Sequence, residues 1–169
     1  MDFQKSSIIK HHSNIRIIMK KITIFLLSLF FISLFTGTVA ATSLPVSSPF
    51  GWRIHPNTGE WKFHTGVDLA YDYGTAIPSV FDGIVLACGD FSDGYGNQVV
   101  VYHPQIDLYT RYAHCMSIAV DYGAAVQQGQ VIAYVGSTGI STGPHVHIEY
   151  IVSDGNGGYM YTDPMILWQ

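Results

Sequence analysis

The stretch STGPHVHIEY, Ser141 to Tyr150, places two histidines two positions apart, between a Gly-Pro turn and an apolar run. From His145 onward, polar residues alternate with aliphatic ones. This period-2 pattern predicts a half-buried β-strand, on which residues i and i+2 point to the same face. We therefore expect His145 and His147 to reach the same site from one side of a sheet.

The segments around this stretch repeat the same chemistry. Short runs rich in β-branched and aromatic residues recur along the chain, namely IVLACG, NQVVVYHP, YTRYAH, VIAYVG and HVHIEYIV. The spacers between them, such as FSDGYG, GSTGISTG and SDGNGG, are composed of turn-forming residues. No window has the apolar period of an amphipathic helix. The sequence predicts a mostly β, single compact domain of antiparallel sheets.

The N-terminal part of the chain has a different character. ITIFLLSLFFISLF, residues 22–35, is almost wholly apolar, follows Lys20-Lys21 and precedes the small residues 38–40. This layout is typical of a secretory signal peptide, so we expect residues 1–40 to be removed. An uncleaved membrane anchor is the alternative, since the apolar block can be extended toward the roughly 20 residues that cross a bilayer. The stretch before Met19 is long for a signal peptide, which makes Met19 an alternative start.

The remainder divides into a Ser/Pro-containing linker, residues 41–48, and one continuous domain, residues 49–169. Without residues 1–40, Lys and Arg fall from 8 to 3 and Asp and Glu from 12 to 11, a net charge of −8 with neutral histidines. Such an acidic chain disfavours nucleic acid as a partner. We expect a monomer that contacts a membrane only if the N-terminal segment is retained.

Two cysteines, Cys88 and Cys115, would meet oxidising conditions after export. A disulfide between them is then allowed, but sequence does not show whether their Cα atoms come within bridging distance. Two buried thiols are the alternative.

A second histidine cluster is FHTGVDLA, in which His64 and Asp68 are four positions apart. Helical and extended backbones both accommodate this spacing. Two imidazoles and one carboxylate around an open fourth position form a common catalytic zinc sphere. If one histidine of the H-x-H pair joins His64 and Asp68, the chain supplies three ligands, and the other imidazole stands beside the open position. His114, in YTRYAHCMS, taken alone is an ordinary strand-end histidine.

Several motifs in order resemble the catalytic domain of lysostaphin-type (LytM-like) zinc endopeptidases. From about Pro49 to Tyr150 these are FGWRIHP, FHTGVDLA, GTAIPSVFDGIV, YGNQVVVYHP, YTRYAHCMS and VQQGQVIAYVGSTGISTGPHVHIEY, and DPMILW matches the usual tail. The resemblance implies long loops around a zinc cleft and one Zn²⁺ per chain. It implies the metal ligands His64, Asp68 and His147 and the catalytic histidines His114 and His145. Cys115 stands where a leucine is common.

The resemblance further implies an exported zinc metalloendopeptidase of the periplasm, cell envelope or extracellular space. Its substrates would be peptide bonds in the stem peptides or cross-bridges of peptidoglycan, cut through a metal-activated water. All five site positions are filled, which favours an active enzyme over a catalytically silent wall-binding or hydrolase-activating module of the same fold. A neutral imidazole can take a proton from water and an imidazolium can protonate the departing amine. The sequence leaves open which of His114 and His145 does which.

Other residues have simpler interpretations. GAAVQQGQVIAYVG resembles the hairpin of biotinyl and lipoyl carriers, but it contains no lysine to carry a prosthetic group. His55 and His103 each precede a proline and are expected not to be ligands. Tyr95, Tyr112 and Thr142 are expected to border the substrate groove.

Overall fold

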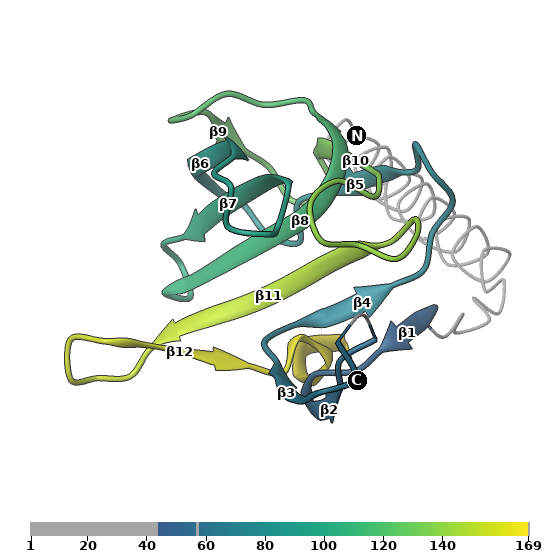
Figure 1. Ribbon diagram of the computed structural model, residues 1–169. Helices are drawn as coiled ribbons and strands as arrows, with labels where there is room; N and C mark the ends of the chain where they lie inside the picture. Colours follow the sequence, from purple (N-terminus) through teal and green to yellow (C-terminus); the bar gives the residue numbers. More distant parts are fainter. Residues whose placement is uncertain (1–43, 57, 169) are drawn as a thin grey trace, which may run out of the picture. The chain divides into compact units, whose positions relative to one another are not determined.

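The computed structural model describes residues 44–168 except residue 57 (Figure 1). The predicted signal segment, its cleavage site and the first residues of the predicted linker lie outside this range. Over the described range we find no helix with the length and apolar character needed to cross a membrane. Cys88 and Cys115 are both free thiols.

Twelve strands and one short 3₁₀ helix make up the described part of the chain. In order they are β1 (Val46–Ser48), β2 (Gly51–Ile54), β3 (Trp61–His64), β4 (Val67–Leu69), β5 (Ala76–Pro78), β6 (Gly83–Asp90), β7 (Asn97–His103), β8 (Leu108–Ile118), β9 (Ala125–Val126), β10 (Val131–Val135), β11 (Val146–Ser153), β12 (Tyr159–Thr162) and η1 (Pro164–Trp168). The prediction of a mostly β domain without α-helices is confirmed for these residues.

All strand pairs are antiparallel. The main sheet has the order β1-β4-β11-β8-β7-β6-β9, with β12 on β11, β10 on β8 and β5 on β10. Strands β2 and β3 form a separate two-stranded ribbon. β1, which lies within the predicted linker, is hydrogen-bonded to β4 and brings Ser48 opposite Asp68.

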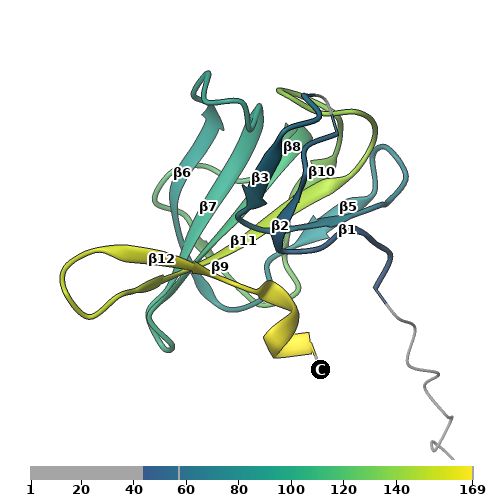
Figure 2. The same cartoon turned by 60° about the horizontal axis from the view of Figure 1, so that its bottom comes forward.

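Strand β11 is an interior strand of the main sheet, between β4 and β8 (Figure 1). Its aliphatic residues Val146 and Ile148 face the hydrophobic core, as the alternation predicts. The expectation of a half-buried strand is wrong, however, because residues 146–150 are all buried. The β2–β3 ribbon lies over the polar face of this strand (Figure 2) and its end contacts that face through His64. A polar site is therefore enclosed between the ribbon and the sheet.

Candidate metal centre and catalytic cleft

Three neighbouring segments bring the predicted ligands together. His147 lies on β11 directly opposite Asp68 on β4, and on its other side opposite Ala113 on β8. His64 ends β3 and reaches the same point from the ribbon. The H-x-x-x-D spacing thus corresponds to a strand end, a bend and a new strand, which settles the choice between helix and extended backbone.

Gly66 makes that bend possible. A Cβ at this position would overlap the backbone oxygen of Ile148 and lie 2.9 Å from the His147 ring. Real Cβ atoms are not found so close to other heavy atoms, so only glycine lets the chain pass from the ribbon into the sheet beside the site.

The three ligand atoms form a compact triangle. His64 Nε2 lies 3.0 Å from His147 Nδ1 and 3.2 Å from Asp68 Oδ1, and His147 Nδ1 lies 2.8 Å from the same carboxylate oxygen. Nitrogen and oxygen ligands bound at about 2.0–2.1 Å in a tetrahedral zinc site are about 3.4 Å apart. The triangle is slightly smaller than such a site and has the donor types that zinc prefers.

The protons of the two ring systems point away from the triangle. His64 Nδ1 lies 2.8 Å from the carbonyl oxygen of Pro49, and His147 Nε2 lies 3.2 Å from the carboxylate of Glu149. These acceptors assign the ring N–H to the outer nitrogen of each neutral imidazole, which leaves a lone pair on each inner nitrogen. Two nitrogen lone pairs and a carboxylate oxygen therefore converge on one point. A cation at this point removes their mutual repulsion, so the residues fit a metal ion.

Glu149 contacts the predicted ligand His147 and is a residue that the sequence analysis did not single out. Its side chain is fully buried, and it accepts hydrogen bonds from Thr65, from the Tyr95 hydroxyl at 2.7 Å and from Arg111 at 2.9 Å. Burial alone would raise the pKa of Glu149, but the hydrogen bonds from His147, Thr65 and Tyr95 lower that pKa below its ordinary value. The carboxylate is therefore ionised where it contacts His147. Its position, two residues after His147, was the signal that it shares the strand face.

His114 and His145 lie beside the triangle. Their rings are 4.7 Å apart between centroids, and His145 Nε2 lies 3.8 Å from Asp68 Oδ1. His114 Nδ1 donates to the carbonyl oxygen of Thr138 at 2.8 Å, and His145 Nδ1 donates to that of Gly143 at 2.9 Å. Each neutral ring thus carries its lone pair on Nε2, where it can take up a proton. Burial lowers the pKa of His114 to about 4, so this imidazole is neutral near pH 7.

A β-bulge directs His114 toward His145 and His147. Between two matched pairs, β7 advances by two residues, from Asn97 to Val99, while β8 advances by three, from Tyr112 to Cys115. His114 has a left-handed backbone with φ of 60°, which is uncommon outside glycine. Strict alternation would give His114 the core-facing position that Tyr112 has. The extra residue instead moves it to the face that carries His147, as bulges beside active sites commonly do.

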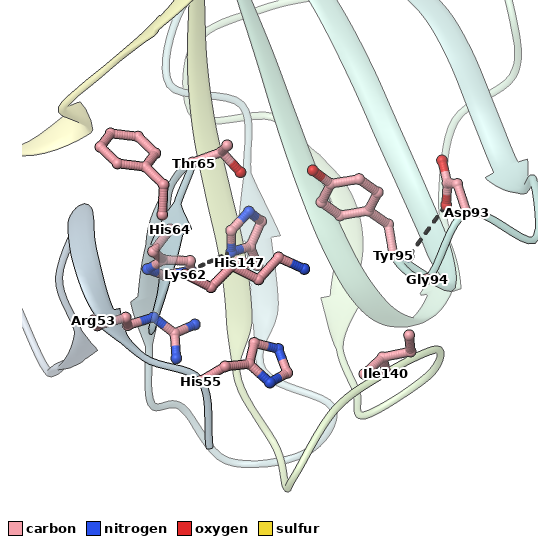
Figure 3. Close-up of a pocket in the computed structure, with 11 residues that line it drawn as sticks. Arg53, His55, Lys62, His64, Thr65, Asp93, Gly94, Tyr95, Ile140 and His147 are labelled. Atoms are coloured by element: carbon pink, nitrogen blue, oxygen red, sulfur yellow. Dashed lines mark hydrogen bonds between the residues drawn. The ribbon is translucent and has the colours of Figure 1, made fainter. Parts of the chain in front are cut away.

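A cleft lies next to the triangle, between the ribbon and two loops (Figure 3). Arg53, His55 and Lys62 stand on the ribbon side, and Tyr95 and Ile140 stand on the opposite side. The full lining is Arg53, His55, Lys62, Phe63, His64, Thr65, Asp93, Gly94, Tyr95, Ile140 and His147. The cleft thus opens onto two of the predicted metal ligands, His64 and His147.

The remaining sequence predictions have mixed outcomes. Arg53, which the sequence analysis did not assign to the site, has its guanidinium 3.6 Å from the outer carboxylate oxygen of Asp68. His103 is buried in the core, where its two nitrogens contact the carbonyl of Asp82 and the hydroxyl of Thr110, far from any ligand role. The groove assignment of Tyr112 is wrong, because its side chain is fully buried and its hydroxyl accepts from the backbone of Val80.

Comparison with known proteins identifies relatives of this domain. The model of Peptidase family M23 matches residues 62–160. The DD-carboxypeptidase/endopeptidase Mpg of Neisseria meningitidis serogroup B is 44% identical over 104 residues, which is 62% of this chain and 24% of that protein. The peptidoglycan DD-endopeptidase ShyC of Vibrio cholerae is 39% identical over 109 residues, 64% of this chain and 25% of that protein. The chain therefore spans about a quarter of the length of the curated relatives that it matches.

Solved structures show the same fold. The catalytic domain of the antimicrobial peptidase lysostaphin from Staphylococcus simulans is 28% identical with a TM-score of 0.65, and the alignment covers 75% of this chain and 93% of that one. A zinc-containing peptidase from Vibrio cholerae is 36% identical with a TM-score of 0.62, over 71% of this chain and 35% of that one.

Proposed function

We propose, from the premise that this chain belongs to peptidase family M23, that it is a zinc endopeptidase that hydrolyses peptide bonds of bacterial peptidoglycan. The observation that carries the proposal is the convergence of two imidazole lone pairs and a carboxylate oxygen within 3.2 Å of one another, beside two further imidazoles. Relatives named as DD-endopeptidases support the reaction class. The match is confined to this domain and covers about a quarter of each relative's own chain.

The metal would be held by His64, Asp68 and His147. When bound, zinc supplies a Lewis acid that acidifies water and polarises a carbonyl group. Arg53 supports this role, because its guanidinium lies against the outer oxygen of Asp68 and keeps the inner oxygen directed at the two imidazoles. Glu149 holds the His147 ring in the same way from the opposite side.

His114 and His145 are proposed to move protons. Each has its Nδ1 proton fixed on a backbone carbonyl, so each presents Nε2 as the basic atom. A neutral imidazole can take the proton of the attacking water, and an imidazolium can donate a proton to the departing amine. The low pKa of His114 keeps its neutral form available near pH 7. The two rings act as a pair, 4.7 Å apart.

We place the protein in the cell envelope or outside the cell, because peptidoglycan lies there and residues 1–40 have the layout of a signal peptide. Residues 49–169 would form the catalytic domain. The catalytically silent alternative is disfavoured because all five site residues are assembled at one place.

The test is mass spectrometry of the fragments that the purified protein releases from purified peptidoglycan. We expect new amino and carboxyl termini at one type of peptide bond, with release abolished by a chelator and restored by zinc. Binding to the polymer without any released fragment would instead support the silent module.

A further inference from the structure

The outer face of the β2–β3 ribbon is unusually apolar and exposed. In the antiparallel register Trp52 pairs with Phe63, and Ile54 pairs with Trp61. The alternate residues Arg53 and Lys62 point into the cleft, on the side of the ribbon that also carries His64. Trp52 is 62% exposed and Trp61 is 66% exposed. The ribbon therefore has one face toward the metal site and a second, aromatic face toward solvent.

The two indoles on this outer face are held in a fixed geometry. The Trp52 and Trp61 rings are parallel to within 5°, with centroids 6.3 Å apart, and the Phe63 ring meets Trp52 edge-on at 5.5 Å. Cross-strand aromatic pairs stabilise a two-stranded ribbon, which is marginal by itself. This stabilising role explains why the rings stack, but it leaves almost two thirds of each indole in water.

We propose that this outer face, defined by Trp52, Ile54 and Trp61, binds a saccharide, namely the glycan strand of the peptidoglycan whose peptides enter the cleft; the proposal rests on the proposed function. A pyranose ring presents a flat face of C–H groups, and these are attracted to the electron-rich face of an indole. The sugar hydroxyls remain hydrated at the edges. Two parallel and exposed indoles match this chemistry.

The distances allow one polymer to contact both faces of the ribbon. Trp61 precedes His64 by three residues on the same strand, which corresponds to about 10 Å. A peptide of four residues reaches at most about 14 Å. The separation along β3 is therefore within the reach of a stem peptide, and the polymer would pass around the edge of the ribbon to contact its outer face.

Charge distinguishes a saccharide from a lipid surface, which also attracts exposed tryptophans. The predicted mature chain has a net charge of −8, so an anionic bilayer would repel it. Of the three Lys and Arg residues between 44 and 168, two, Arg53 and Lys62, lie on this ribbon. Both side chains line the cleft, and their positive charge suits a polymer whose peptides end in carboxylates.

The experiment measures binding of peptide-free glycan strands, prepared by amidase treatment of peptidoglycan, to the full-length protein and its variants. We expect Trp61→Ala and Trp52→Ala to weaken binding by about tenfold, the effect of one lost aromatic contact. The control Tyr122→Ala removes an aromatic ring that is 75% exposed on another loop and should bind as the wild type does. Cleavage of intact peptidoglycan should fall with binding, while turnover of a soluble, sugar-free cross-linked peptide should not change.

Four results would overturn the proposal. The first is glycan binding that the tryptophan variants leave intact. The second is that Trp61→Ala and Trp61→Phe both lose zinc and lose turnover of the soluble peptide as much as cleavage of intact peptidoglycan. The stacked Trp52 and Trp61 would then have a purely structural role. The third is that the tryptophan variants lose binding to vesicles of phosphatidylethanolamine and phosphatidylglycerol while their glycan binding is unchanged. The fourth is that Trp61→Ala converts a dimer to a monomer. Glycan binding without any peptide cleavage would overturn the proposed function and leave this proposal standing.

Discussion

The four histidines gathered around Asp68 form two pairs that differ in the backbone structure that carries them. His64 and His147 lie on regular strands, and their inner nitrogens are 3.2 Å and 2.8 Å from Asp68 Oδ1. His114 lies in a β-bulge with a left-handed backbone, and His145 lies in an isolated bridge just before β11. The regular pair is placed to bind a metal ion, while the irregular pair lies just outside the triangle of ligand atoms.

The difference shows that one residue type can take two tasks through its distance from a shared carboxylate and, for His147 alone, through a charged partner of its second nitrogen. In the inner pair, His147 donates to the ionised Glu149, which adds negative charge behind the ligand and increases its basicity. In the outer pair both rings donate to backbone carbonyls, which orient the ring without adding a charge. We expect substitutions in the two pairs to separate metal binding from proton transfer.

The largest effect is expected from the inner pair. His64→Ala or Asp68→Ala should lower the zinc content from about one ion per chain to nearly none, because two ligands do not hold a catalytic zinc. Turnover should fall by at least ~1000-fold, since the Lewis acid contributes several kcal/mol to the transition state. Metal analysis and peptidoglycan hydrolysis would measure this. The matched control is His55→Ala, which removes an imidazole from the same cleft and should keep the metal.

The outer pair should respond differently. His114→Ala and His145→Ala should each keep one zinc and lose at least ~100-fold in turnover, the scale of a lost acid-base group. The measurement is kcat at saturating zinc together with the zinc content of the same sample. Turnover like that of the wild type in one variant would remove that histidine from proton transfer. Loss of zinc would place it among the ligands.

A smaller effect is expected behind the inner pair. Glu149→Gln keeps the shape of the side chain but removes the charge that His147 contacts, so zinc affinity should fall by about 10-fold to 100-fold. Competition with a chelator of known affinity would measure the change. Glu60→Gln, on the exposed turn between β2 and β3, is the control. If both variants bind zinc with equal affinity, the charge of Glu149 stabilises Arg111 and Tyr95 and does not support His147 as a metal ligand.

Alternation along the strands was sufficient to predict the fold class and the shared face of His145 and His147. The same alternation also places Glu149 on the face of His147. Its buried hydrogen bonds with Arg111 and Tyr95 depend on how neighbouring strands pair, and the pattern of one strand does not predict that pairing. The rule fails at His114 because one inserted residue reverses the faces beyond it, and bulges leave no periodic signal. Resemblance to a family, rather than periodicity, identified this histidine.

The burial of β11 on both faces was also beyond local sequence patterns. Polar residues at alternate positions normally indicate contact with water. Here the β2–β3 ribbon, from a distant part of the chain, covers them and supplies His64. Tyr112 illustrates the converse, because this aromatic residue was expected in the groove and is instead fully buried in the core.

The smallest expected effect concerns a fifth histidine, His103, which is buried in the core and serves no metal. Burial lowers the pKa of His103 in the folded state, whereas in the unfolded chain it titrates near 6.5. Below pH 6.5 the unfolded chain therefore binds a proton at His103 that the native state does not bind. The free energy of unfolding then falls as the pH falls, and His103 contributes at most about 1.4 kcal/mol per pH unit to this change.

The variant His103→Gln should be less stable than the wild type at pH 7.5, because it loses the contacts with Asp82 and Thr110. Its stability should nevertheless change less than that of the wild type between pH 6.5 and 5.5. Denaturant unfolding of both proteins at saturating zinc would test this, and equal pH slopes would show that His103 is not the acid-sensitive group of the core.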